Sequence, residues 1–366
     1  MTEARHLMLV SALVDRRLRE QVAAGRRPRP EYLALEQDHG VTLLDWSDLG
    51  GSGRRRGLRA SLAHTAAALR QVGGFDAVLS DGEHVGVPLA LAMSLTGRRA
   101  PHVVIGHHVT TPAKRVVFRH LVRRLGARGV PRLVLHSPRQ VTLAQVELGL
   151  HAARLSLLPY GIDGRFWSPR GDSEQALIVT AGREHRDFLT LARACRQLEA
   201  RVLVAHGSHH SPRARRAEPD LWPRGFEVRP LDHLSLREAY GRAAVVVVPL
   251  VPTDFQAGIT TLLEAMAMGK AVVVSATQGL QGTVEDQVTA LTVPPGDPDA
   301  LRAAIAGLLT RPRERARLGA NARSAVEARF GLERYAAGLA AELQAVTRGG
   351  PLRAPTRGSA APGLSR

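Results

Sequence analysis

Residues 245–277 read VVVVPLVPTDFQAGITTLLEAMAMGKAVVVSAT, and two apolar runs in this stretch flank a helical segment. Both runs are apolar on either face, as in strands that helices cover from two sides. A loop containing Gly258 leads into a helix that begins near Ile259 or Thr260 and closes at Gly269, a glycine typical of a helix C-terminus. This strand–helix–strand unit predicts a parallel sheet with right-handed crossovers.

The same alternation of short apolar runs and amphipathic stretches extends along the whole chain. The expected strands are 7–13, 41–46, 76–81, 102–108, 132–137, 154–161, 176–182, 201–207, 226–232, 245–250, 271–277 and 290–295. Two successive series in 366 residues predict an α/β protein with two doubly wound, Rossmann-like domains that face a cleft. The expected boundaries are 1–165 for the first domain, 166–330 for the second, 331–348 for a closing helix that packs back on the first, and 349–366 for a disordered basic tail.

Composition limits the function. The formal net charge of +17 comes almost entirely from arginine, since Lys114 and Lys270 are the only lysines. GC-rich codon usage explains the choice of arginine over lysine, and the positive excess attracts phosphate in a nucleotide, an anionic lipid or a nucleic acid. With 4% aromatic residues and no recognisable module, a nucleic-acid-binding protein is disfavoured.

The same survey predicts a cytoplasmic protein. The N-terminal apolar run is short and is followed at once by Asp15 and two arginines, which indicates a buried first strand and not a secretory signal. No stretch reaches the roughly 18 apolar residues of a membrane span. The single cysteine, Cys195, excludes a disulfide framework and lies in an apolar helical stripe, as a core residue does.

The start of the helix near Thr260 has the properties of an anion site. The backbone N–H groups of a first helical turn carry partial positive charge, so the amides of Thr260 and Thr261 suit a pyrophosphate. Glu264 lies one turn further into the helix, where a carboxylate can accept hydrogen bonds from the two hydroxyls of a ribose. On spacing alone, a solvated helix glutamate is an equally good interpretation.

Residues 262–273, LLEAMAMGKAVV, resemble the signature of the family 4 retaining glycosyltransferases. In that signature two glutamates eight positions apart flank a glycine-rich loop. Glu264 matches the second glutamate and Gln256 occupies the first position, while Ala257 and Ile259 replace the loop glycines. The resemblance implies the two-domain GT-B fold, ribose binding by Glu264 and a place beside the donor sugar for Gln256. It assigns the donor to the second domain and the acceptor to the first.

Three further stretches, 157–169, 179–195 and 293–330, are similar to the same family. Within the second of them, the resemblance implies that Arg183 and Arg186 contact the donor phosphates, which guanidinium groups bind in a bidentate manner. The family generally uses no metal and no cofactor, and the nucleotide sugar is a co-substrate. Asp297-Pro298-Asp299 is interpreted as a helix start, with Asp297 as N-cap, and not as a metal-binding pair of aspartates.

In the first half, two groups of polar residues follow predicted strands. The resemblance implies that a histidine contacts the donor sugar; His107 is favoured as the catalytic residue by its position, and His108 remains an acceptor-side candidate. Asp81 and Glu83, after the preceding strand, are candidates to orient an acceptor hydroxyl, and a solvated loop is the alternative. The family's glycine pair after the first strand is missing, which predicts a different acceptor site.

Two basic segments suit an anionic surface. GGSGRRRG, residues 50–57, matches dinucleotide-binding loops only weakly and is interpreted as a flexible basic loop. Residues 112–129 have the pattern of a basic amphipathic helix, which is either a core helix or a peripheral contact with an anionic membrane.

The sequence therefore predicts a retaining transferase that moves a hexosyl group from a UDP- or GDP-sugar to a hydroxyl acceptor, with no metal. Two alternatives remain open. One is a degenerate member that binds a nucleotide sugar or a partner without turnover, which Gln256 favours. The other is a sugar-nucleotide epimerase.

Overall fold

The structure of the protein is a computed structural model in which residues 4–49, 58–98, 100–109, 111, 114–120, 131–206 and 222–349 are described. The chain divides into two compact units. Unit 1 contains residues 1–14, 35–158 and 338–366, and unit 2 contains 15–34 and 159–337. Each unit has its own six-stranded parallel sheet and its own hydrophobic core.

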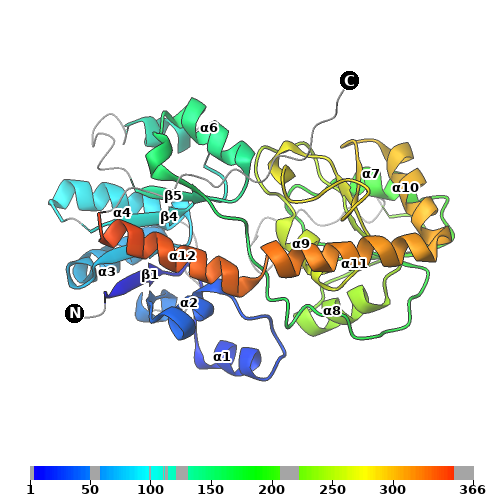
Figure 1. The fold of residues 1–366 in the computed structure, drawn as a ribbon, viewed down its shortest axis with the longest axis horizontal. Helices are drawn as coiled ribbons and strands as arrows, with labels where there is room; N and C mark the ends of the chain where they lie inside the picture. Colours follow the sequence, from blue (N-terminus) through cyan, green and yellow to red (C-terminus); the bar gives the residue numbers. More distant parts are fainter. Residues whose placement is uncertain are drawn as a thin grey trace. The chain divides into compact units, whose positions relative to one another are not determined.

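Unit 1 is built around a sheet with strand order β2-β1-β3-β4-β5-β6 (Figure 1). Its strands are β1 (His6–Leu9), β2 (Thr42–Leu44), β3 (Ala77–Ser80), β4 (His102–Ile105), β5 (Arg132–Leu135) and β6 (Leu155–Leu157). Its helices include α3 (Leu58–Gln71), α4 (Glu83–Thr96) and α6 (Pro138–Leu148). The four central strands are buried along their whole length, because helices cover both faces of the sheet.

Unit 2 repeats the design with the order β12-β11-β10-β7-β8-β9. Its strands are β7 (Leu177–Ala181), β8 (Arg201–Ala205), β9 (Phe226–Arg229), β10 (Val245–Val248), β11 (Val272–Ser275) and β12 (Leu291–Val293). Its helices include α7 (Phe188–Cys195), α8 (His233–Arg242), α9 (Ile259–Ala267), α10 (Pro298–Thr310) and α11 (Pro312–Arg329). The four valines of β10 pair with β7 on one side and β11 on the other, so this strand lies inside the sheet.

The expected strands and caps agree with these elements. All twelve predicted strands are present, each inside its expected range or starting one residue before it. The helix expected near Ile259 begins there as α9, and Gly269 follows its end with φ 65°, where Lys270 N donates to Ala265 O. Asp297 caps α10 by accepting hydrogen bonds from the amides of residues 299 and 300, as its sequence context predicts.

Two helices run from one unit into the other. Residues 15–34, with α1 (Arg16–Ala23) and the start of α2 (Glu31–His39), belong to unit 2, whereas the sequence placed all of 1–165 in one domain. One of their contacts with unit 2 is the hydrogen bond from Arg29 N to Asp163 Oδ2, at 2.8 Å. The closing helix α12 (Leu332–Thr347) ends in unit 1, where Glu342 forms a buried ion pair with Arg132 of β5 at 2.7 Å.

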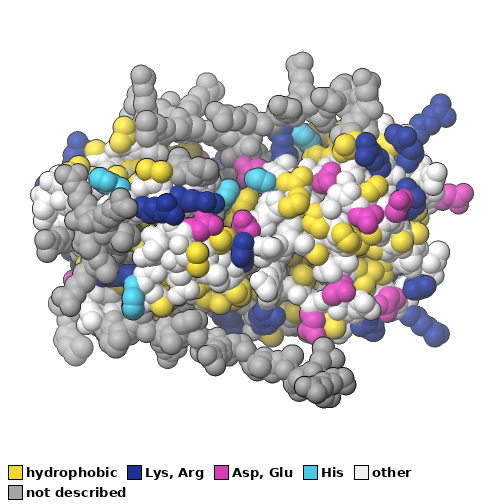
Figure 2. Space-filling model, turned by 90° about the horizontal axis from the view of Figure 1, so that it is seen from above, with side chains coloured by type: hydrophobic (Ala, Val, Ile, Leu, Met, Phe, Trp, Pro, Cys, Tyr) yellow, Lys and Arg dark blue, Asp and Glu magenta, His cyan; other side chains and the backbone are white. Residues whose placement is uncertain are grey.

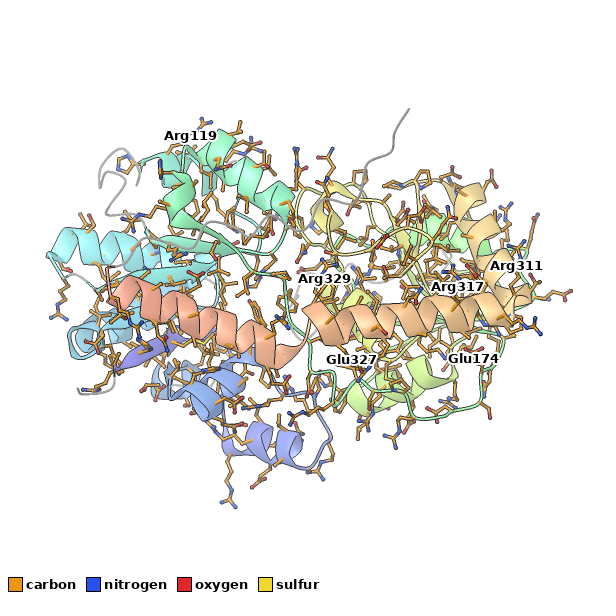
Figure 3. The ribbon with its side chains drawn as sticks, viewed as in Figure 1. Arg119, Glu174, Arg311, Arg317, Glu327 and Arg329 are labelled. Carbon is orange, nitrogen blue, oxygen red and sulfur yellow. The ribbon has the colours of Figure 1, made fainter. Side chains whose placement is uncertain are left out.

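Many arginines are engaged within the fold. On the face that Figure 2 shows, basic and acidic side chains both occur among the described residues. Figure 3 shows Arg317, Glu327 and Arg329 on α11. Arg317 bonds Glu314 and the carbonyl of Gln287, and Arg329 donates to the carbonyl of Gly282. Part of the positive excess therefore holds neighbouring segments together.

Three predictions concern residues outside this description. The basic loop 50–57 and residues 112–113 and 121–129 of the predicted basic helix are not among the described residues, and neither are residues 350–366 of the predicted tail. Residues 114–120 form the described part of that helix, and Phe118 on it is buried. Among the described residues, no helix combines the length and apolarity needed to cross a bilayer.

Candidate functional site

The predicted site residues fall into two groups, one in each unit, and both groups follow the carboxyl ends of parallel strands. Ligands of open α/β sheets bind at this edge. In unit 2 the group surrounds the loop after β7 and the start of α9. In unit 1 it follows β3 and β4.

The first turn of α9 has no side-chain cap. Its N-cap is Gly258, with φ 76°, and no side-chain hydrogen bond satisfies the first amides of the helix. A Cβ at this position would lie 2.9 Å from Val248 and 3.1 Å from Arg186, so only glycine fits without displacing its neighbours. Thr260 is exposed and Thr261 is buried. The N–H groups of Thr260 and Thr261 are thus placed as an anion site requires.

Arg186 lies between this turn and the end of β7. Its Nε donates to the carbonyl of Ala181 at 2.9 Å, one Nη to Glu184 O at 3.0 Å and the other Nη to Thr261 Oγ1 at 3.0 Å. Gly182, with φ 84°, leaves room for the guanidinium, which a Cβ there would approach to 2.6 Å. Burial lowers the pKa of Arg186 to about 10, so the group remains charged at neutral pH. Two of its five N–H groups remain for a phosphate.

Glu264 is buried, with 8% of its surface exposed, which the interpretation as a solvated helix residue did not foresee. Its Oε2 accepts a hydrogen bond from the hydroxyl of Tyr240 on α8 at 3.2 Å. Burial raises the pKa of Glu264 to about 8, although the Tyr240 hydroxyl and the charge of Arg186 lower it. Once a buried carboxyl group of this kind ionises, it accepts a strong hydrogen bond from a hydroxyl group.

The other two predicted donor residues have different surroundings. Gln256 is buried and its Nε2 donates to Thr283 Oγ1 at 3.1 Å. Arg183 is half-buried. Burial of His206, directly after β8, lowers the pKa of that histidine, and the charge of Arg183 lowers it further. Arg183 therefore lies on the same sheet edge as Arg186, while Gln256 belongs to the loop that precedes α9.

In unit 1, the side chain of Glu83 holds the turn after β4 in place through hydrogen bonds. Its carboxylate accepts hydrogen bonds from the amides of His107 and His108 at 3.0 and 3.1 Å and from Lys114 Nζ at 2.5 Å. Burial opposes its ionisation, but the adjacent His107 and Lys114 outweigh this effect and hold the pKa of Glu83 at about 2. These contacts occupy both carboxylate oxygens in shaping the turn.

Asp81 forms similar hydrogen bonds to the chain that follows β1. Its Oδ2 accepts hydrogen bonds from the amide and the hydroxyl of Ser11 at 2.5 and 2.6 Å. The exposed ring of His107 donates from Nε2 to the carbonyl of Asp81 at 2.8 Å. His108 is half-buried, and its carbonyl accepts from Lys114. The four predicted residues are thus brought together, with the ring of His107 as the exposed member.

Sequence reasoning missed the partners of these residues. Tyr240, Thr283, Lys114 and Ser11 each bond to a predicted site residue at least 24 positions away in the chain. No spacing rule connects such pairs, because only the packing of separate strands and helices brings them together. Among the described residues, no group of three His, Cys, Asp or Glu side chains is placed to hold a metal ion.

Comparison with known proteins identifies the segment that carries the unit 2 site. Residues 175–311, which include β7, α9 and the loop between β10 and α9, match the family "Glycosyl transferases group 1". This segment is therefore similar to the group 1 glycosyltransferases. The signature residues Gln256 and Glu264 both lie within it.

Two curated relatives are D-inositol 3-phosphate glycosyltransferases. The one from Segniliparus rotundus is 32% identical over 266 residues, which are 63% of this chain and 57% of the relative. The one from Kribbella flavida is 35% identical over 158 residues, or 43% of this chain and 34% of the relative. The matched part of the chain thus spans little more than half the length of the first relative and about a third of the second.

Solved structures support the glycosyltransferase fold over nearly the whole chain. Sucrose-phosphate synthase from Thermosynechococcus elongatus superposes with a TM-score of 0.73 at 18% identity, covering 95% of this chain and all of that one. The Anabaena HepE protein in complex with UDP and glucose gives a TM-score of 0.67 at 16% identity, over 93% of this chain and all of HepE. The two parallel sheets with surrounding helices are the GT-B fold of these glycosyltransferases, as predicted.

Proposed function

We propose that this protein transfers a hexosyl group from a UDP- or GDP-sugar to a hydroxyl acceptor, with retention of the anomeric configuration. The observation that carries the proposal is the uncapped start of α9, followed one turn later by the buried carboxylate of Glu264. The match to the group 1 glycosyltransferases supports the reaction class. The complexes of HepE with UDP and with UDP-glucose support the class of donor.

The site residues of unit 2 have distinct roles in the proposed reaction. The pyrophosphate binds to the amides of Thr260 and Thr261, to Arg183 and to the remaining N–H groups of Arg186, while Glu264 binds the ribose. When the bond from the anomeric carbon to the phosphate oxygen breaks, negative charge develops on the leaving phosphate. Fixed cations and oriented amides stabilise that charge without reorganising.

The proton of the acceptor hydroxyl passes to the departing phosphate oxygen as the new glycosidic bond forms. This route needs no protein nucleophile, and we propose that it needs no divalent metal and no cofactor. The enzyme's second task is to hold the acceptor hydroxyl close to the anomeric carbon. We assign that task to the group around His107, His108, Asp81 and Glu83 in unit 1, where the two carboxylates act by shaping the turns.

The acceptor is also a matter for proposal. The curated relatives are named for D-inositol 3-phosphate, which makes this polyol phosphate one acceptor to test. The basic segments 50–57 and 112–129 favour a second one, a lipid-linked hydroxyl reached from the cytoplasmic face of an anionic membrane. No nucleic acid is required in either case.

The test combines binding with turnover. UDP, GDP, UDP-glucose and GDP-mannose are screened for thermal stabilisation of the full chain, since a ligand that binds the native state raises the unfolding temperature. Turnover is then measured by nucleotide release with inositol 3-phosphate and with lipid-linked acceptors, and the anomer of the product is read by NMR. Failure of every nucleotide to stabilise the protein contradicts the proposal, and inversion at the anomeric carbon contradicts the retaining route.

One observation favours a second function. Gln256 lacks the charge of the glutamate that the family signature has at this position, and its amide bonds to Thr283. A protein that binds a nucleotide sugar or a partner without turnover is therefore the alternative. Nucleotide binding with no release of nucleotide from any donor, across the acceptor panel, is the result that this alternative predicts.

A further inference from the structure

Tyr240 has a buried hydroxyl group, and neither the sequence pattern nor the family signature identifies this residue as part of the site. It lies on α8, is completely buried, and packs its ring against Trp167 with the centroids 5.8 Å apart. Its hydroxyl donates to Oε2 of Glu264 at 3.2 Å. A buried phenol needs a hydrogen-bond partner, and here that partner is the carboxylate proposed to bind the ribose.

The surroundings of the Glu264 carboxyl come from three other segments. Tyr240 approaches from α8, Arg186 from the loop after β7, and Tyr160 from the chain after β6. Thr261, on α9 itself, interacts with the Tyr240 hydroxyl and accepts a hydrogen bond from Arg186. Tyr240 thus touches both the carboxylate and the residue that anchors the arginine loop.

The two oxygens of the carboxyl group are not equivalent. Oε2 receives the Tyr240 hydroxyl, whereas no described residue donates a hydrogen bond to Oε1. A glutamate side chain can rotate about its terminal bond, and a hydrogen bond to one oxygen restricts that rotation. Restriction before the ligand arrives reduces the entropy lost on binding.

We propose that Tyr240 is a positioning residue for the nucleotide: by holding Oε2 of Glu264, it presents Oε1 to the ribose hydroxyls. This inference rests on the proposed function and deepens it, because it explains how a buried carboxylate is kept ready for a sugar. It also assigns α8, outside the signature helix, to the donor site.

The arrangement gives nucleotide binding a definite pH dependence. Burial raises the pKa of Glu264 to about 8, and the Tyr240 hydroxyl is the first of the groups that lower it. The carboxylate form binds the hydroxyls more strongly than the acid form, so affinity rises as the pH rises through the pKa. Loss of the Tyr240 hydroxyl raises the pKa further, which moves this rise to higher pH.

The experiment compares Tyr240→Phe with the matched variant Tyr335→Phe. Both remove one hydroxyl from a buried tyrosine of unit 2, and the ring of Tyr335 packs against that of Tyr160 with the centroids 5.4 Å apart. UDP binding is measured by calorimetry from about pH 6 to about pH 9, with GDP in parallel. Above about pH 8, where Glu264 is ionised, Tyr240→Phe is expected to bind roughly tenfold more weakly, as loss of a hydrogen bond to a charged group implies. Its pH midpoint is expected to move upward, while Tyr335→Phe matches the wild type.

A double variant separates positioning from packing. If Tyr240 acts through Glu264, adding Tyr240→Phe to Glu264→Gln changes UDP affinity much less than it does in the wild type. Equal affinity and an equal pH midpoint in wild type and folded Tyr240→Phe overturn the inference. If wild-type protein binds neither UDP nor GDP, the proposed function fails first, so the two failures are distinguishable.

Discussion

Replacing Glu264 with glutamine should make the ligand-free protein more stable and its nucleotide binding weaker. Glutamine keeps the shape of the side chain and an oxygen that accepts from Tyr240, but it has no charge to bury. The pKa of Glu264 is about 8 in the fold against an ordinary value of 4.5. As the pH rises above 4.5 the unfolded chain releases this proton while the folded chain keeps it, so stability falls.

The size of the expected stability gain follows from the pH interval between the two pKa values. Each pH unit between the two pKa values costs about 1.4 kcal/mol of folding free energy, which amounts to about 3 kcal/mol at pH 7. Urea unfolding of Glu264→Gln at pH 7 should therefore show a gain of this order, and the gain should shrink towards zero as the pH falls to 4.5. Above about pH 8, where Glu264 is ionised, nucleotide binding should weaken by roughly 1.5–3 kcal/mol through loss of the charge-assisted partner of the ribose.

The control is Glu199→Gln, a change at an exposed glutamate of unit 2. It should leave both the unfolding free energy and nucleotide affinity near their wild-type values. The reasoning is refuted if Glu264→Gln has the same stability as the wild type at every pH between about 5 and about 8. Unchanged nucleotide affinity in a folded Glu264→Gln variant refutes the assignment to the ribose alone.

Other predictions concern the remaining charged groups. Glu83→Gln should lower the unfolding free energy by about 3 kcal/mol at pH 7, because the depressed pKa of Glu83, about 2, gives stability that is present above pH 4.5 and lost as the pH falls towards 2; a loss that persists unchanged at pH 2 contradicts this. Gln256→Glu should raise the rate of nucleotide release from the donor if the missing charge limits turnover, and an equal or lower rate shows that it does not. EDTA should leave turnover unchanged, and activity that EDTA abolishes and manganese restores contradicts the metal-free route. Flotation with anionic vesicles should capture the protein at low salt and release it as salt rises, and the change of residues 54–56 to glutamate should weaken capture; protein that stays free at low salt favours a soluble acceptor.

The fold follows from the sequence because its signals are local. Runs such as that of β10 are apolar at every position, which only a strand covered on both faces requires. Gly269 and Asp297 mark a helix end and a helix start through their own backbone and side-chain chemistry. The path of residues 15–34 was not predictable in this way, because they contact unit 2 through residues distant in the chain, such as Asp163, which lies more than 100 positions after Arg29.

The candidate site was only partly predictable for the same physical reason. The identity of Glu264 and Gln256 came from a motif, and the anion-binding turn of α9 came from helix geometry. Their burial and their hydrogen bonds to Tyr240 and Thr283 depend on how α8 and the chain after β11 pack against α9. A carboxylate with a pKa of about 8 is therefore a property of the packed unit and not of the local sequence.

At the carboxyl ends of the unit 1 strands, hydrogen bonds hold the chain where the expected glycine pair after the first strand is missing. The family's glycine pair would let the chain after the first strand turn closely, and here that chain is instead held by Ser11, whose amide and hydroxyl both bond to Asp81. Glu83 fixes the neighbouring turn after β4 in the same manner. Both oxygens of Glu83 and Oδ2 of Asp81 are engaged in these bonds, so the two carboxylates define the shape of the edge, and the ring of His107 is exposed beside them. Removing either carboxylate should consequently disturb folding before it disturbs any acceptor contact, whereas a change at His107 acts on the exposed surface directly.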